Sequence, residues 1–316
     1  MSSFRTEWHP TAAESPRCIN HSDRIVAIGS CFAENMAMKL RATMMRVVSN
    51  PLGTMFNPAS IYSCIKRLCE KRVFTPEELF EHQGRLHTFD THSSLSCSGT
   101  AEEALARLND TVVSGSRSIA EADTLILTLG TAWIFTLAGS QKIVANCHKL
   151  PASRFVRSRL SIEQTAAYID SICDTVRHIN PGVKIFITVS PVRHLADGLH
   201  GNQLSKATLM LGADCSAAEF HYFPSYEIMC DDLRDYRFYA ADMLHPSDTA
   251  VDYIYEKFLS TCFTSEAVAA AGECAALHRR LSHRIAPETP RNIIDKFLTD
   301  TDNLRAALIK KYPYLK

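Results

Sequence analysis

The fold is decided by the stretch Arg24-Ile25-Val26-Ala27-Ile28-Gly29-Ser30-Cys31, in which a short apolar run passes directly into a glycine and a helical pattern. Two later runs have the same character, Asp123-Thr124-Leu125-Ile126-Leu127-Thr128-Leu129 and Val183-Lys184-Ile185-Phe186-Ile187-Thr188-Val189. Nearly continuous apolar and β-branched residues are typical of parallel strands buried on both faces. A fainter strand is predicted at Met44-Met45-Arg46-Val47-Val48.

Helical patterns with clear start signals separate these strands. Asn57-Pro58 predicts an N-cap followed by proline at the first helical position. Thr75-Pro76-Glu77-Glu78 and Ser161-Ile162-Glu163-Gln164 have the form of a capping box. Strands that alternate with helices of this length predict an α/β fold with a parallel sheet. Beyond Phe263 the sequence is Ala-rich and then interrupted by prolines, so we predict a domain over 1–263 and a helical extension over 264–316.

The composition excludes several classes of protein. The 316 residues carry 34 basic and 34 acidic side chains, so no excess of positive charge is present to hold nucleic acid or an anionic membrane. No apolar run reaches the length that spans a bilayer. Eleven cysteines without a CxxC pair, behind an N-terminus without an apolar segment, predict reduced thiols and a cytoplasmic location. We expect no cofactor and no metal site, since no HExxH occurs and the histidines are scattered.

Ligands of a doubly wound parallel sheet bind beyond the carboxyl ends of its strands, so chemistry is expected there. Ser30 follows the first strand at the start of a helix, where the positive helix end and its own N–H favour an oxyanion. A serine hydroxyl needs a base with an orienting carboxylate. Asp242 and His245, three residues apart, provide both.

Simpler interpretations of these residues stay open. Ser30 is also well placed to be only an N-cap, and His245 to be a capping or core histidine. Cys31 is a rival nucleophile, although buried cysteine usually acts as a small apolar residue. Ser190 with His194 is a second rival pair, although a polar strand end beside proline is more often a structural turn.

The segment Gly29-Ser30-Cys31-Phe32-Ala33 resembles the signature of the GSCFA family, a branch similar to the SGNH (GDSL-like) hydrolases. The resemblance covers about residues 24 to 260 and rests on further blocks. These blocks are Asn50-Pro51-Leu52-Gly53-Thr54-Met55-Phe56-Asn57-Pro58, Leu129-Gly130-Thr131-Ala132-Trp133, Asn146-Cys147-His148-Lys149-Leu150-Pro151, Ser190-Pro191-Val192-Arg193-His194 and Tyr222-Phe223-Pro224-Ser225-Tyr226-Glu227.

This resemblance implies a flavodoxin-like three-layer α/β/α sandwich with Ser30, His245 and Asp242 as a catalytic triad. It also implies an oxyanion hole completed by a glycine N–H after the second strand, for which Gly53 fits, and by an asparagine after the third. The sequence departs from that pattern, because Thr131 occupies the region of the asparagine. The Thr131 hydroxyl is one replacement donor, and Asn57 from the neighbouring loop is another.

Polar residues in these blocks are expected to shape a substrate pocket, with His148, Arg193 and His194 as its binding residues. The predicted reaction is hydrolysis of a small-molecule or carbohydrate ester, for example an O-acyl group on a sugar. An O-acyltransferase uses the same acyl-enzyme with a hydroxyl acceptor. A non-catalytic module that binds a glycan or a protein on the same scaffold is the third alternative.

Overall fold

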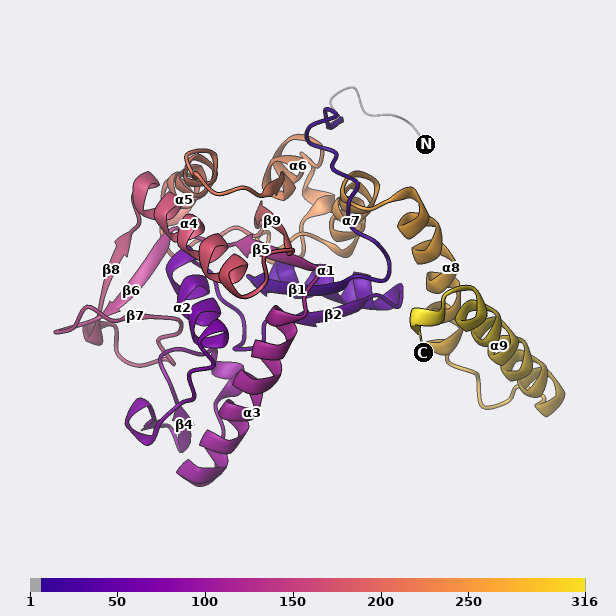
Figure 1. The fold of residues 1–316 in the computed structure, drawn as a ribbon, viewed down its shortest axis with the longest axis horizontal. Helices are drawn as coiled ribbons and strands as arrows, with labels where there is room; N and C mark the ends of the chain where they lie inside the picture. The colour runs from indigo at the N-terminus through magenta and orange to yellow at the C-terminus, as the bar shows by residue number, and fades with distance from the viewer. Residues whose placement is uncertain (1–6, 316) are drawn as a thin grey trace.

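The protein, described by a computed structural model over residues 7–315, is built around a five-stranded sheet in which all strands run parallel (Figure 1). The spatial order of the strands is β10-β9-β5-β1-β2. Their bounds are β1 Arg24–Gly29, β2 Arg46–Ser49, β5 Thr124–Leu129, β9 Lys184–Val189 and β10 His221–Phe223. Numbered along the chain within this sheet, the order is 2-1-3-4-5, which is the flavodoxin-like arrangement.

Helices cover both faces of the sheet, as the alternation of strand side chains requires. Val26 and Ile28 of β1 pack into one core with helices α2 to α5, whereas Ile25 and Ala27 pack into a second core with α1, α6, α7 and α8. The three-layer sandwich is thereby confirmed. The helices are α1 Cys31–Ala42, α2 Pro58–Cys69, α3 Ala101–Ala120, α4 Ile162–Ile179, α5 Gly198–Asp214, α6 Ser225–Asp231, α7 Asp248–Cys262, α8 Ser265–Leu281 and α9 Arg291–Lys311.

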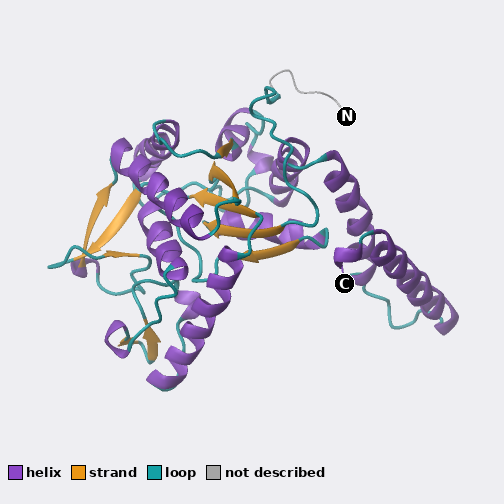
Figure 2. Ribbon diagram, viewed as in Figure 1, coloured by secondary structure: helices purple, strands orange, loops and turns teal. Residues whose placement is uncertain are grey.

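Smaller elements surround this core. A three-stranded antiparallel sheet of order β7-β6-β8 and a hairpin of β3 and β4 lie apart from the central sheet, on the left of the view in Figure 2. Their bounds are β3 Phe80–His82, β4 Arg85–His87, β6 Trp133–Leu137, β7 Ile143–Val144 and β8 Phe155–Arg159. Short 3-10 helices complete the chain: η1 Pro76–Glu78, η2 Ser93–Leu95, η3 Ala152–Arg154, η4 Tyr236–Phe238 and η5 Pro313–Leu315.

The C-terminal residues form the predicted helical extension. Helix α8 packs on α1 and α7 through Ala267 and Ala271, and α9 folds back against α8. Together they project from the side of the sandwich opposite the β7-β6-β8 sheet (Figure 1). The division into two domains at Phe263 stays a prediction. Among the described residues, no helix has both the length and the apolar character needed to cross a bilayer.

The structure corrects two local predictions. The second strand begins at Arg46, two residues later than expected, and ends at Ser49. The capping box at Thr75 forms, but it starts only the 3-10 helix Pro76–Glu78, because the chain turns extended at Leu79 and pairs with β4. A capping box satisfies the first N–H groups whatever follows, so it indicates a helix start without fixing a helix length.

Candidate active site

Ser30 lies where β1 ends and α1 begins, at the point where the strand order of the sheet reverses. Gly29 makes this turn possible. Its φ is +149°, and a Cβ on it would lie 2.1 Å from the carbonyl oxygen of Thr128 on β5. The Ser30 Oγ accepts the N–H of Phe32 at 3.3 Å, so Ser30 is the N-cap of α1, and the residue is 1 % exposed.

A cavity of about 640 Å³ opens beside this turn. Its polar wall includes Cys31, Asn57, Thr131, Arg193, His194 and His245. Aromatic side chains form another part of the wall, contributed by Phe56, Trp133 and Phe135. These residues come from the ends of several strands and from the loops that follow them, which is where a doubly wound sheet binds its ligands.

Asp242 and His245 form the pair that their spacing predicted. The Nδ1 atom of His245 lies 2.6 Å from Oδ2 of Asp242. The other carboxylate oxygen accepts the backbone N–H groups of Leu244 at 2.9 Å and of His245 at 3.0 Å. These bonds lower the pKa of Asp242 to about 2, and the bond from the His245 N–H has the largest effect. A carboxylate held in this way fixes the histidine with Nδ1 as donor and Nε2 free for chemistry.

The structure brings His245 and the start of α1 to one cavity without joining the base to the nucleophile. His245 and Cys31, the neighbour of Ser30, both line the cavity. No hydrogen bond links Ser30 to His245 in the described part of the chain, and the His245 side chain is 45 % exposed whereas Ser30 is buried. As the N-cap, Ser30 Oγ only accepts the Phe32 N–H, so its own proton stays available to an imidazole that approaches it.

Two of the predicted oxyanion donors already donate hydrogen bonds to backbone carbonyl groups. The Ser30 N–H donates to the carbonyl oxygen of Thr128 at 3.1 Å, and the Gly53 N–H donates to Asn50 at 2.8 Å. Gly53 does not line the cavity either; it sits in a turn with φ +81° packed on His92. Neighbouring carbonyl groups thus occupy both N–H groups in this structure, and the oxyanion roles of Ser30 and Gly53 stay predictions.

The other two predicted donors do reach the cavity. Asn57 caps α2 through its Oδ1, which accepts the Ser60 N–H at 2.8 Å, and its Nδ2 has no hydrogen-bond partner among the described residues. Thr131 follows β5, where the Gly130 and Thr131 N–H groups both donate to the Phe56 carbonyl at 2.8 Å. Asn57 and Thr131 therefore offer side-chain donors from adjacent loops.

The three predicted binding residues separate into two groups. Arg193 and His194 line the cavity. The His194 Nε2 is buried without a hydrogen-bond partner in the described part of the chain, and burial together with the Lys206 charge lowers the pKa of this histidine to about 4. His148 is buried and does not line the cavity. Its Nε2 lies 2.8 Å from the Thr88 carbonyl oxygen, and its Nδ1 lies 3.1 Å from Nδ1 of His87.

The rival nucleophiles are poorly activated in this geometry. Burial raises the pKa of the Cys31 thiol, and the nearby Asp242 carboxylate acts in the same direction. Ser190 is fully buried, and its Oγ accepts the N–H of Val192 at 3.3 Å. No hydrogen bond joins Ser190 to His194 within the described residues, so this pair has the geometry of a structural turn.

Comparison with known proteins identifies the family. The sequence profile of the GSCFA family matches residues 24–258, about three quarters of the chain. The chain belongs to the GSCFA family. No curated protein matches it. The matched range contains Ser30, Asp242 and His245, whereas α8 and α9 lie outside it.

Other cavity residues of this GSCFA protein were not anticipated from the sequence. Arg157 and Asp197 form an ion pair with Nη2 2.7 Å from Oδ2, and the guanidinium of Arg157 lies 4.8 Å from the centre of the Trp133 ring. The pair joins β8 to the loop before α5, which are far apart in sequence. No local pattern signals such a contact, although Trp133 itself stands in a family block.

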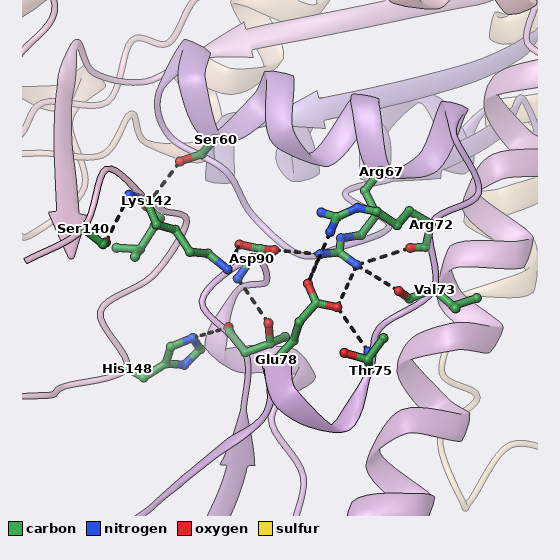
Figure 3. A network of polar contacts seen from close by, with 12 residues as sticks. Ser60, Arg67, Arg72, Val73, Thr75, Glu78, Asp90, Ser140, Lys142 and His148 are labelled. Carbon is green, nitrogen blue, oxygen red and sulfur yellow. Dashed lines mark hydrogen bonds and ion pairs between the residues drawn. The ribbon is translucent and has the colours of Figure 1, made fainter.

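A network of charged side chains links α2 to the segment before β7, and Figure 3 shows its residues. Arg67 of α2 is fully buried and bonded to Asp90 at 2.7 Å and to Glu78, and Asp90 also pairs with Lys142 at 2.9 Å. Lys142 immediately precedes β7, and Ala145, which follows β7, lines the cavity. The network thereby connects α2 to the loop that forms one side of the site. Within residues 7–315 no group of three or more metal-ligating side chains is placed to hold an ion.

Proposed function

We propose that this GSCFA protein is a serine hydrolase of the SGNH type that cleaves an ester through an acyl-enzyme. Ser30 is the nucleophile, His245 the general base and Asp242 the residue that orients and stabilises the histidine. The preferred substrate is an O-acyl ester on a carbohydrate. The likeness of the family to SGNH hydrolases is part of this proposal.

One observation carries this proposal. The Asp242–His245 pair, at 2.6 Å, lies at the edge of the same cavity that Cys31 lines beside Ser30, at the switch point of a flavodoxin-like sheet. A histidine with its Nδ1 bonded to a carboxylate and its Nε2 free is the general base that a serine nucleophile requires. His245 lines this cavity with its side chain 45 % exposed, so its Nε2 is accessible to a substrate bound beside Ser30.

In the proposed reaction His245 Nε2 takes the Ser30 proton while Oγ attacks the ester carbonyl. The bond to the leaving alkoxide breaks, and the alcohol departs with the proton from His245. Water then attacks the acyl-Ser30 ester by the same route, which releases the acid and restores the serine. The Asn57 amide and the Thr131 hydroxyl stabilise the negative oxygen of each tetrahedral intermediate.

The composition of the cavity supports a sugar ester. Phe56, Trp133 and Phe135 present ring surfaces, and Asn146 and Arg193 add hydrogen-bonding groups near them. Sugars bind through a combination of apolar ring faces and directed hydrogen bonds, and a volume of about 640 Å³ lies within the usual range of small-molecule sites.

Turnover of p-nitrophenyl acetate and butyrate tests the proposal. We expect wild-type protein to release p-nitrophenol and Ser30→Ala to lose at least about 10³-fold in turnover. The matched control is Thr264→Ala, which removes an N-cap hydroxyl from α8, a helix that contributes no residue to the cavity, and retains wild-type turnover. Equal rates in wild-type and Ser30→Ala protein would refute the assignment. Product analysis with sugar acceptors separates hydrolysis from acyl transfer.

A further inference from the structure

Helix α5 presents three buried polar side chains on one face, Asn202, Ser205 and Lys206, which are 4 %, 2 % and 0 % exposed. Their spacing of three and four residues places them side by side. None of them pairs with a carboxylate in the described residues. Buried polar groups are normally hydrogen-bonded, so the partners of these three show what the helix face holds in place.

All three side chains bond to the two loops that form the cavity. The Lys206 Nζ donates to the carbonyl oxygens of Gly130 and Ser190, both at 2.7 Å, and these residues directly follow β5 and β9. Asn202 Oδ1 accepts the N–H of His194 at 3.0 Å. One helix face therefore fixes the first turn of both loops.

Ser205 determines where the Thr131 hydroxyl proton points. Ser205 Oγ accepts the Ala132 N–H at 2.8 Å and lies 2.9 Å from Thr131 Oγ1, its other partner. Because no other acceptor is near in the described residues, the buried Ser205 O–H donates to Thr131. Thr131 Oγ1 also accepts the Trp133 N–H at 3.1 Å, so both of its lone pairs are occupied.

One group is thereby left free, the O–H of Thr131, in a residue that lines the cavity. The reverse arrangement, with Thr131 donating to Ser205, would leave the Ser205 proton buried without an acceptor. We propose that Ser205 is a positioning residue that directs the Thr131 hydroxyl proton onto the oxyanion of the reaction, while Lys206 anchors the Gly130 turn that carries Thr131. This inference rests on the proposed function.

Inactivation by a fluorophosphonate ester provides the test, since it forms a Ser30 Oγ–P bond, expels fluoride and transfers the serine proton to His245. The developing charge on the phosphonyl oxygen needs the same donors as an ester oxyanion. Saturation kinetics separate the inactivation rate constant from the binding constant of the probe. The melting temperature of each variant reports on folding.

We expect Thr131→Val to lower the inactivation rate constant by about 10²–10³-fold, the usual cost of one oxyanion donor, and Thr131→Ser to stay within about threefold of wild type. Ser205→Ala lowers it by about tenfold with the binding constant unchanged, because Thr131 keeps its proton but loses its direction. The matched control is Thr208→Val on the same helix, whose hydroxyl bonds only the Leu204 carbonyl among the described residues; its rate stays within about twofold.

The outcomes separate the two claims. A wild-type rate in Ser205→Ala, or in Thr131→Val, overturns the inference and leaves the proposed function intact. An unreactive wild-type protein overturns the proposed function itself. If Ser205→Ala does not fold, the comparison of Thr131→Ser with Thr131→Val still decides whether the hydroxyl proton matters.

Discussion

Asp242 holds His245 by both ends of its carboxylate: Oδ2 lies 2.6 Å from the imidazole Nδ1, and Oδ1 accepts the backbone N–H of the same histidine at 3.0 Å. The ring and the backbone of His245 are thus fixed by one side chain. Bonds from the backbone of the loop, together with the imidazole, lower the pKa of Asp242 to about 2. The carboxylate therefore stays charged across the pH range in which a histidine base works.

The Asp242→Asn variant tests this relationship. The asparagine amide can still accept backbone N–H groups, but it carries no charge to hold a positive imidazolium, so we expect turnover of p-nitrophenyl acetate to fall by about 10²–10⁴-fold. The melting temperature changes little, because the pair is exposed. Turnover within a few-fold of wild type would show that the carboxylate has no part in the chemistry.

Gly29 sets the exit of β1, and its replacement by alanine has a predictable cost. The added Cβ would lie 2.1 Å from the Thr128 carbonyl oxygen, which is backbone and cannot turn aside. We expect the free energy of unfolding in urea to fall by about 3 kcal/mol. The control is Gly182→Ala, where a Cβ meets nothing within 4 Å, and which we expect to change stability by less than about 0.5 kcal/mol. Equal stability of the two variants would contradict the described turn.

Arg67 is the fully buried cation of the charged network that Figure 3 shows. Arg67→Met removes the cation from between Glu78 and Asp90 and leaves two carboxylates close together, so we expect a loss of about 3–5 kcal/mol in the free energy of unfolding. Arg24→Met, which breaks an exposed pair with Glu121, is the control and costs less than about 1 kcal/mol. Similar losses in both would show that the network is not the stabilising element.

Lys206 gives the stability a specific dependence on pH. Burial lowers the pKa of Lys206 from 10.5 to about 7 in the folded protein. Between these values the unfolded chain binds a proton that the folded protein lacks, so the free energy of unfolding rises with pH from about 7 to about 10.5. Compared with Lys206→Met, the wild-type protein should gain on the order of 1 kcal/mol per pH unit in this window. Parallel stability curves for the two proteins would contradict the lowered pKa.

The central strands were predictable because burial on both faces leaves a continuous apolar run. This condition holds for β1, β5 and β9. It fails for β10, which has only three residues, and for the antiparallel β6 and β8, whose side chains are partly exposed. Helix α3 carries a capping box at Thr100 and Glu103, a signal present in the sequence that the predicted helices did not include.

Helix α5 was not predicted from the sequence, and the reason is physical. Part of its buried face consists of Asn202, Ser205 and Lys206, so the apolar stripe that identifies an amphipathic helix is interrupted. Two of the polar residues that interrupt this stripe, Ser205 and Lys206, are those we propose to position the Thr131 hydroxyl. Departures from the simple pattern are expected where a fold supports chemistry.

Only the contacts of the site that are made within one loop could be predicted from the sequence. The contact between Asp242 and His245 is made within one loop, so their spacing was sufficient. The oxyanion donors depend on carbonyl groups of other segments, Thr128 for the Ser30 N–H and Asn50 for the Gly53 N–H. Such competition between distant segments leaves no mark in the sequence around the donors.

The sharpest test of Ser30 as a nucleophile activated by His245 is mass mapping of a fluorophosphonate adduct, in the wild-type protein and in His245→Ala. We predict an adduct on the peptide that contains Ser30 in the wild type, and a rate of adduct formation at least about 10³-fold lower in His245→Ala. An adduct absent from Ser30 in the wild type, or formed equally fast without the imidazole, would contradict this assignment.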